Sequence, residues 1–352
     1  MEPRWKQLKN SPYLKKNLEA RARIITAIRA FFDASGYLEV ETPIVVAKPG
    51  MEPHLEPFRT EVTDPYGNAF PAALITSPEY AMKKLLVAGF TQIYQIVKCF
   101  RNGEAFEGRH NPEFTMIEWY RSQTDYTGIM DDAEALVKDV ARSAIGKTGI
   151  VWRGRAIELD QAWQRLSVRE AMQTYANIDL DAALEDKWLL LEAAAKLGHV
   201  LAPDVSWDDA FFSVFLNAVE PHLGLERPTF LYEYPVSMAA LSKTSSRDSR
   251  YAERFELYIG GLELANAFTE LTDAVEQRAR LEEESMLRKT LGRFDHGIDE
   301  DFVAALEEGM PEAGGIALGV DRLVMLLLGE EDIRSVIAFP AGAMFQKKND
   351  PA

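Results

Sequence analysis

Two arginines and a histidine lie close together in the segment Tyr94–Arg121, YQIVKCFRNGEAFEGRHNPEFTMIEWYR. Arg101 follows an apolar run, and Arg109 and His110 come at the end of a polar loop that contains glycines. The next run, Phe114–Tyr120, again has strand character, so the segment predicts a hairpin with the basic residues at its tip. Guanidinium groups bind phosphate oxygens through paired donors, which makes a triphosphate the first candidate ligand.

Two carboxylates in a later strand-like segment are candidate metal ligands. Glu263 and Glu270 lie seven positions apart, so on an uninterrupted strand they would face opposite sides. If both serve one site, Ala265–Ala267 must bulge or twist. Two carboxylates with the amide of Asn266 near a nucleotide would suit Mg²⁺, which prefers oxygen ligands. Solvated charges on a strand are the alternative.

Two predicted helix starts also suit a ligand. Ser77 and Pro78 precede a helix that begins at Glu79, where free backbone donors converge. A plain N-cap at Ser77 and a first-turn charge at Glu79 are the alternative. Gly314–Arg322 predicts a small-residue strand that enters a buried helix. Because helix N-termini favour negative charge, a cation at Arg322 invites an anionic ligand.

The composition bounds the class of protein. A chain of 352 residues can bury a sizeable core, and we expect one large domain over residues 1–352. The formal net charge of -16 argues against a surface devoted to nucleic acid. The single cysteine, Cys99, lies in an apolar run, which predicts a buried thiol in a reducing compartment. No apolar run approaches the roughly 20 residues that cross a bilayer. With no signal peptide either, a cytoplasmic protein without a membrane partner is expected.

The chemistry-bearing residues need elements that position them. Leu14–Phe32 has an apolar face at helical spacing, and Tyr37–Pro43 alternates as a strand. Pro43 donates no ladder hydrogen bond, so it suits a sheet edge or an interface. A long helix that feeds an edge strand could pair two protomers; an ordinary helix and strand are the alternative.

The rest of the chain predicts both strands and helices. Phe58–Phe70 predicts a hairpin around Asp64–Gly67. Residues 128–225 are rich in Ala, Leu, Glu and Asp and predict a mostly helical insertion that serves packing. Strand character returns at Ala252–Phe268, and Asp273 is a predicted N-cap of a charged surface helix.

Together these residues resemble the catalytic domain of class II aminoacyl-tRNA synthetases, specifically the lysyl branch. The helix with Tyr37–Pro43 resembles motif 1, Phe100–Phe114 resembles motif 2, and Gly315–Arg322 resembles motif 3. The three occur in the family's order and span nearly the full length. The resemblance implies an α+β fold, with an antiparallel β-sheet flanked by helices, and ATP and Mg²⁺ as cofactors. It also implies a homodimer formed through the motif 1 region.

By position, the resemblance assigns roles around ATP. Arg101 would hold the α-phosphate and stabilise charge in the transition state, and Phe114 would stack on adenine. Arg322, the second catalytic residue, would bind the other adenine face and the γ-phosphate. Glu263 and Glu270 would hold the metal. The remaining ATP-binding positions are Asn102, Gly103, Glu104, His110, Asn111, Leu264 and Gly319, together with Glu263 itself. In the common motif 2 order, Arg-x-Glu, the glutamate would come one place earlier than Glu104.

The resemblance also assigns the amino-acid side of the site. Glu118 and Tyr120 match the family's motif for an ammonium group at the end of a long side chain, since a carboxylate and a phenol supply charge and direction. Asn266 matches the residue near the substrate carboxylate. The other substrate positions are Ser77, Pro78, Glu79, Glu270 and Ala317.

Two departures from the lysyl enzymes narrow the substrate. Those enzymes have Ala-Pro-Glu where this chain has Ser77-Pro78-Glu79, and glycine where it has Ala317. The added hydroxyl and methyl groups disfavour an α-amino group and accommodate one displaced to the β-carbon. This combination is similar to the ligases that attach β-lysine to elongation factor P.

That branch implies ATP-dependent activation of (R)-β-lysine as the adenylate and transfer to a lysine of elongation factor P. Motif 1 begins almost at once, so no anticodon-binding domain is expected, and neither is tRNA binding. Two alternatives remain. One is an α-lysine-activating paralogue that acts on tRNA or a small amine, and the other is a synthetase-like regulatory subunit without catalysis.

The pocket argument predicts the effect of removing one methyl group. Ala317→Gly should improve the use of α-lysine relative to β-lysine in ATP–pyrophosphate exchange, because it removes the methyl group from the pocket floor. Unchanged selectivity between the two isomers would mean that Ala317 serves only strand packing.

Overall fold

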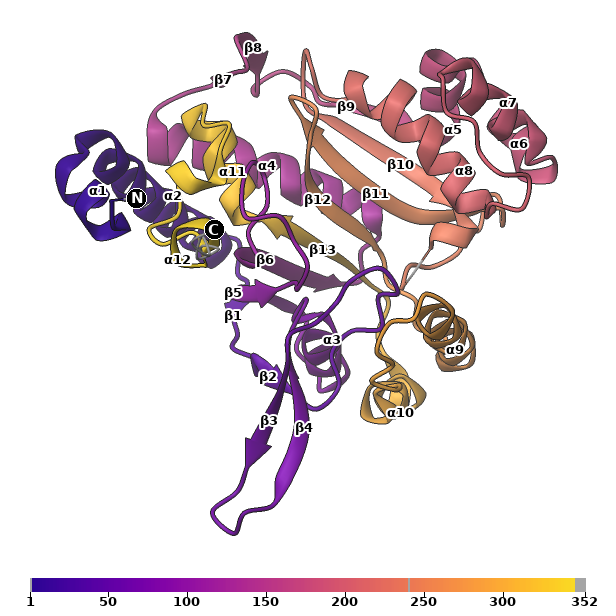
Figure 1. Cartoon of the computed structure of the whole chain (residues 1–352), viewed down its shortest axis with the longest axis horizontal. Coiled ribbons are helices and arrows are strands. Elements are labelled where there is room, and N and C mark those ends of the chain that lie inside the picture. Colours follow the sequence, from indigo (N-terminus) through magenta and orange to yellow (C-terminus); the bar gives the residue numbers. More distant parts are fainter. Residues whose placement is uncertain (1, 240, 346–352) are drawn as a thin grey trace, which may run out of the picture.

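A large central sheet organises the chain, of which this computed structural model describes residues 2–239 and 241–345. Its strands are β1 (Leu38–Glu39), β5 (Gln92–Phe100), β6 (Glu113–Ser122), β9 (Gln164–Ser167), β10 (Thr229–Pro235), β11 (Tyr251–Ile259), β12 (Leu262–Thr269) and β13 (Ala313–Gly319). They lie in the order β1-β5-β6-β13-β12-β11-β10-β9 (Figure 1). The strands from β5 to β10 are antiparallel neighbours, whereas β1 and β9 join the two edges in parallel. The predicted α+β fold with an antiparallel sheet is confirmed.

Three helices cover one face of this sheet and form the main core. They are α2 (Pro12–Ala34), α4 (Tyr126–Ile145) and α11 (Val320–Leu328). Helix α2 begins after Ser11, whose side chain accepts a hydrogen bond from Leu14 N. Its residues Ile24, Ile28 and Phe32 follow the four-residue spacing of one helix face and are fully buried. The predicted strand and buried helix at Gly314–Arg322 are confirmed as β13 and α11.

A second set of helices covers part of the opposite face. It comprises α3 (Glu79–Val87), α9 (Ala274–Thr290) and α10 (Glu300–Gly309). Their apolar side chains pack together around Met82, Leu281 and Phe302. The expected cap at Asp273 is confirmed, because its side chain accepts hydrogen bonds from Val275 N and Glu276 N.

The expected helical insertion at 128–225 divides into two parts that pack differently. Helix α4 belongs to the central core, where Ile129 and Leu136 are fully buried against the sheet. A separate apolar cluster begins at Val168 and covers β10 and β11 (Figure 1). The helices of that cluster are α5 (Val168–Ala171), α6 (Leu180–Glu185), α7 (Trp188–Lys196), α8 (Trp207–Val214) and the short turns at Met172–Ala176, Phe215–Val219 and Glu220–His222. The apolar face of α4 therefore supports the sheet itself.

A small sheet projects from the body of the molecule (Figure 1). It has the order β2-β4-β3 and contains the hairpin predicted around Asp64–Gly67. Its strands are β2 (Val45–Val46), β3 (Arg59–Thr63) and β4 (Ala69–Leu74). The remaining elements are β7 (Gly149–Trp152), β8 (Arg155–Glu158), α1 (Arg4–Asn10), α12 (Ala341–Met344) and single helical turns at Val236–Met238 and Ile333–Ser335. Among the described residues, no helix has both the length and the apolar character required to span a bilayer.

Aromatic packing around Phe32 predicts a large stability effect. The ring stacks on Tyr94 with centroids 4.6 Å apart and also contacts Trp119 at 5.2 Å. Phe32→Ala should lower the free energy of unfolding by about 3–5 kcal/mol, because it leaves a cavity in the core. Chemical denaturation measures the change. As the control, Phe70→Ala removes a ring that is 53% exposed on β4 and should cost less than about 0.5 kcal/mol. Equal losses would contradict this assignment of the core.

Candidate active site

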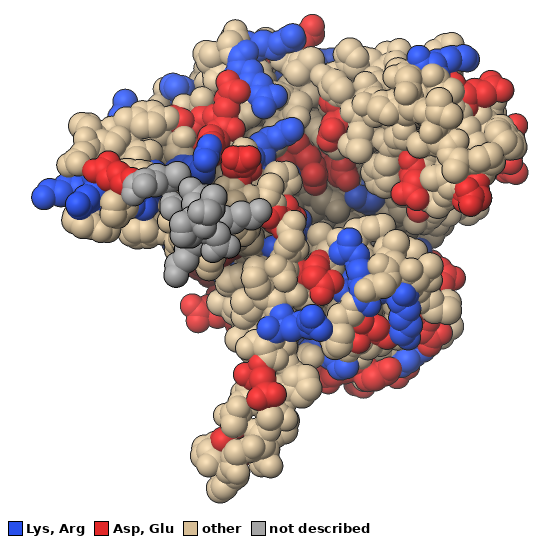
Figure 2. Space-filling model, viewed as in Figure 1, with Lys and Arg blue, Asp and Glu red and all other residues tan. Residues whose placement is uncertain are grey.

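The alternation of side chains along the strands builds the floor of a pocket of about 360 Å³. On β6, Ile117 and Trp119 belong to the main core. The residues that alternate with them line the pocket, namely Phe114, Met116, Glu118 and Tyr120. The pocket therefore occupies the sheet face that α2, α4 and α11 leave open. Figure 2 shows the hollow near the centre of this view, with acidic side chains along it.

A row of side chains crosses four strands on this floor. Glu118 pairs with Ala317, Ala317 with Asn266, and Asn266 with Glu256. The Ala317 methyl group thus lies between the carboxylate of Glu118 and the amide of Asn266. Adjacent strands are about 4.8 Å apart, so Glu118 and Asn266 are separated by roughly 10 Å.

A β-bulge brings Glu263 to the pocket face. Leu257 on β11 pairs with Ala265, but the next residue of β11 pairs with Glu263, which leaves Leu264 as the extra residue. The expected bulge exists, but its predicted position at Ala265–Ala267 is wrong. Those three residues stay in register with both neighbouring strands, because Ala265 and Ala267 are packed into the main core.

The two carboxylates predicted as a metal pair have different partners. Glu270 lies outside the pocket lining and forms an ion pair with the buried Lys83, at 2.5 Å. Glu263 instead lies near Glu256. Burial raises the pKa of Glu263 most, and the negative charge of Glu256 raises it further. The metal role expected for Glu270 is thus not supported by this geometry, which favours Glu256 and Glu263.

Glu256 and Glu263 have the chemistry of a Mg²⁺ site that shares its ion with a ligand. Mg²⁺ is commonly held by one or two carboxylates, with phosphate oxygens and water in the other positions. Within the described residues, no group of three or more His, Cys, Asp or Glu side chains is arranged to hold a metal by itself. Tyr234 and Arg254 donate hydrogen bonds to Glu256, each at 2.6 Å, which orient its carboxylate.

The opposite end of the floor suits an ammonium group. Glu118 is 1% exposed and accepts hydrogen bonds from Ser77 Oγ at 2.6 Å and from the Tyr120 hydroxyl at 2.8 Å. Lys83 lies between Glu79, at 2.6 Å, and Glu270, at 2.5 Å. Three carboxylates therefore surround one protein cation. A buried excess of negative charge calls for a cationic ligand.

Gly315 makes this close arrangement possible. A Cβ atom at that position would lie 2.2 Å from Glu270 Oε1 and 2.4 Å from a ring carbon of Tyr120. Any side chain there would push both groups away, so the ammonium end of the pocket depends on a glycine in β13.

The other end of the pocket has the groups expected around a nucleotide. The Arg101 guanidinium lies over the Phe114 ring, 5.0 Å from its centroid. Arg101 Nε is buried and has no hydrogen-bond partner among the described residues, so it has a donor to spare for a ligand. Arg322 Nη1 donates to the backbone carbonyl of Glu263 at 2.8 Å, which holds the guanidinium beside the bulge.

The motif 2 loop contributes a second polar pair. His110 Nδ1 lies 2.8 Å from Glu104, and this contact is the main reason why the pKa of Glu104 is lowered. Asn111 also lines the pocket, but its amide bonds to backbone atoms of Glu113, at 2.5 Å, and Ala341, at 2.8 Å. The Asn111 side chain therefore connects the motif 2 loop to the C-terminal segment at Ala341.

Most of the predicted site residues meet in this one pocket. They are Ser77, Glu79, Arg101, Glu104, His110, Asn111, Phe114, Glu118, Tyr120, Glu263, Leu264, Asn266, Ala317, Gly319 and Arg322. Asn102 and Gly103 instead line a neighbouring hollow with Arg293. Pro78 occupies the cap position of α3, and Ser77 Oγ accepts from Glu79 N as well as donating to Glu118. Ser77 therefore precedes the cap residue and still bonds to the first residue of the helix, and its role toward a ligand stays a prediction.

Four further residues that the sequence did not single out surround the site. Arg254 and Glu256 line the pocket, Glu52 approaches it from a loop, and Lys83 lies behind Glu79. Arg254 and Glu256 are opposite charges spaced by two, so they lie on one face of a strand that also contains Glu253, which was a usable signal. Arg254 Nε donates to Asn266 Oδ1 at 3.1 Å, which turns the amide nitrogen of Asn266 into the available donor.

Comparison with known proteins shows the family of the chain. Residues 1–343 match the class II tRNA synthetases of the D, K and N group, and the chain belongs to that family. The elongation factor P–(R)-β-lysine ligase of Proteus mirabilis is 46% identical over 329 residues, which are 92% of this chain and 94% of the relative. The ligase of the same name from Yersinia enterocolitica is 43% identical, over 93% and 95% of the two chains. The lysine–tRNA ligase of Pelotomaculum thermopropionicum is 41% identical over 94% of this chain, but over 64% of its own length.

Glu118 predicts a pH-dependent affinity for an ammonium ligand. Burial, followed by the charge of Glu79, raises the pKa of Glu118 to about 8. The carboxyl group is then mostly neutral at pH 6 and becomes an ionised partner as the pH rises. The dissociation constant of 6-aminohexanoate, measured by calorimetry, should fall roughly tenfold between pH 6 and pH 7 and level off above pH 8.

Glu118→Gln provides the control, because an amide does not titrate. Its affinity should be weaker and should change less over the same pH range, where Glu270, whose pKa burial also raises to about 8, is the remaining carboxyl group that titrates. A wild-type affinity that does not change from pH 6 to pH 9 would show that Glu118 is ionised throughout.

Proposed function

We propose that this chain is an ATP-dependent, AMP-forming ligase that activates (R)-β-lysine and transfers it to a lysine of elongation factor P. The observation that carries the proposal is the row formed by Glu118, Ala317 and Asn266, with Ser77 bonded to Glu118. The backbones of Glu118 and Asn266 are two strand spacings apart, roughly 10 Å, which leaves room between their side chains for a six-carbon chain with an ammonium at one end and a carboxylate at the other. Relatives named for this activity are 43 to 46% identical over 92 to 93% of the chain.

The first step joins the amino acid to AMP. A carboxylate oxygen of β-lysine, held by the Asn266 amide, attacks the α-phosphorus of ATP. A new carboxylate–phosphorus bond forms, the bond from the α-phosphorus to the bridging oxygen breaks, and pyrophosphate leaves. Arg101 and Arg322 stabilise the charge that spreads over the phosphate oxygens, so catalysis is by positioning and electrostatics. No side-chain nucleophile is required.

Glu256 and Glu263 would hold the Mg²⁺ ion, which neutralises phosphate charge when bound. Phe114 supplies the stacking surface for adenine, with Arg322 on the opposite face. His110 and Glu104 face the triphosphate from the motif 2 loop.

The second step transfers the acyl group. The neutral amine of the acceptor lysine attacks the carbonyl carbon of the adenylate and forms an amide bond. The carbon–oxygen bond to AMP breaks, AMP leaves, and the amine loses its proton. The acyl group thus passes directly from AMP to the protein acceptor.

We also propose the domain organisation, the oligomeric state and the cellular location of the protein. One catalytic domain spans residues 1–352, of which Met1, Ala240 and 346–352 lie outside the described residues. A homodimer forms through the motif 1 region. Support comes from exposed apolar side chains in and just after this region, since Leu38 on β1, Ile44, and Val45 on β2 are 50%, 39% and 44% exposed. We place the protein in the cytoplasm, with elongation factor P rather than tRNA as the acceptor.

ATP–pyrophosphate exchange tests the reaction. Exchange should require (R)-β-lysine, be much weaker with α-lysine, and be absent without an amino acid. Radiolabelled β-lysine should then pass to elongation factor P and not to tRNA. Exchange with α-lysine alone would favour a synthetase paralogue, and no exchange with any amino acid would favour a regulatory subunit.

The same assay tests Arg101. Arg101→Ala should abolish exchange while the protein stays folded, because the α-phosphate loses its main cationic partner. Arg165→Ala, which removes an arginine outside the pocket, is the matched control and should retain wild-type exchange. An active Arg101 variant would refute the assigned role.

A further inference from the structure

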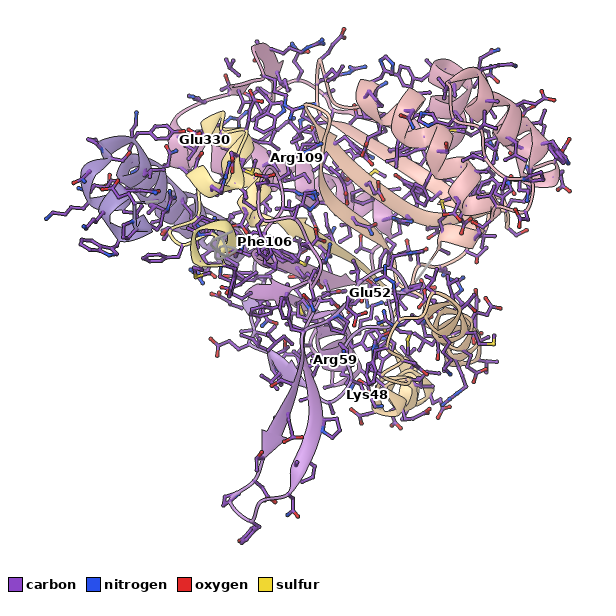
Figure 3. All side chains as sticks on the ribbon, in the orientation of Figure 1. Lys48, Glu52, Arg59, Phe106, Arg109 and Glu330 are labelled. Atoms are coloured by element: carbon purple, nitrogen blue, oxygen red, sulfur yellow. The ribbon has the colours of Figure 1, made fainter. Side chains whose placement is uncertain are left out.

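A loop between β2 and β3 brings one carboxylate to the pocket that the reaction does not yet use. Glu52 lines the pocket together with Ser77, Glu79 and Arg101. Figure 3 places Glu52 between the central sheet and α9 in this view. The loop belongs to none of the three sequence motifs. Its contribution to the site comes from the fold.

The loop is held in place by basic groups from α9 and the segment after it. Arg288 is fully buried and donates to the carbonyls of Glu52 and Leu55, both at 2.7 Å. Arg293 donates to the carbonyl of His54 at 2.9 Å, and the His296 ring bonds to the carbonyl of Gly50 at 3.1 Å. Four backbone carbonyls of the loop are thus hydrogen-bonded to side chains of α9 and of the segment that follows it. The Glu52 side chain is therefore positioned before any ligand arrives.

The Glu52 carboxylate has one oxygen engaged and one available. Oε2 accepts from Thr76 Oγ1 at 3.0 Å, whereas Oε1 makes no hydrogen bond to any described residue. Thr76 precedes Ser77, so this contact fixes Glu52 next to the segment that faces the substrate amine. Among the acidic groups nearby, Glu79 already has Lys83 as its partner, at 2.6 Å. Among the described residues Glu52 forms no ion pair within 4.0 Å, although burial raises its pKa and the charge of Arg101 acts in the opposite direction.

The ligand required by the proposed function has two ammonium groups. Glu118 and Tyr120 suit the terminal one, and Glu118 bonds to Ser77, whereas Glu52 bonds to the preceding residue, Thr76. The second ammonium needs its own acceptor. An ammonium donates up to three hydrogen bonds and binds carboxylates most strongly where water is excluded.

We propose that Glu52, together with Glu79, binds the second ammonium group of the substrate, so that Glu52 determines specificity for a diamino acid. This inference rests on the proposed function. Ala317 limits the position of the amine from the sheet floor, and Glu52 attracts it from the covering loop. An amine on the β-carbon satisfies both constraints, whereas a substrate without a second amine gains nothing from Glu52.

Glu52→Gln tests the assignment, because glutamine keeps the size of the side chain and an acceptor for Thr76. Two substrates are compared in pyrophosphate exchange. (R)-β-lysine has the second amine, and 6-aminohexanoate lacks it. The variant should lose about 10- to 100-fold in kcat/KM for (R)-β-lysine and change by less than about twofold for 6-aminohexanoate. Calorimetry with both ligands gives the same comparison without turnover.

Glu56→Gln is the matched control on the same loop. Glu56 contacts Arg288 at 3.3 Å and lies outside the main pocket, so its substitution should leave the ratio between the two substrates unchanged. Equal losses for both substrates in Glu52→Gln would show a structural role for Glu52, and no loss would show no role; either result overturns the inference. A wild-type protein that fails to use (R)-β-lysine would instead refute the proposed function.

Discussion

The strict alternation of side chains on a β-sheet is the constraint on which this structure depends. One face of β6, β13, β12 and β11 must supply the main core, and the other must supply the pocket. A shift of one residue in any strand would bury the charges and expose the apolar side chains. The extra residue at Leu264 relieves that constraint at one point, so Glu263 reaches the pocket while Ala265 and Ala267 stay buried.

Charge balance is the second constraint, and it separates the two ends of the pocket. Around Lys83, carboxylates outnumber cations, and Gly315 lets Glu270 and Tyr120 approach closely. At the other end, Arg101 and Arg322 face the region of Glu256 and Glu263. A zwitterionic chain with an ammonium at one terminus and a carboxylate at the other fits this polarity in one direction only. The fixed charges of the pocket therefore favour one orientation of such a chain.

Local patterns in the sequence predicted the elements well, because their causes are local. The turn at Asp64–Gly67, the cap at Asp273 and the strand before Arg322 each depend on a few neighbouring residues. The bulge position was not predictable in this way, since it depends on register with two other strands. The partner of Glu270 was missed for a similar reason, because Lys83 lies far away in the sequence on α3. The contact between the helix at 126–145 and the central sheet was not predictable, because composition does not reveal which face a helix covers.

The hydrogen bonds from Arg288 to the Glu52 loop have a consequence for how such a pocket can change during evolution. A fully buried guanidinium ties the wall of the site to α9, outside the three motifs that define the family. Residues outside the binding motifs therefore determine the position of the loop that forms this wall of the pocket. New substrate preferences can then arise from the packing of a distant helix, while the nucleotide-binding motifs remain untouched.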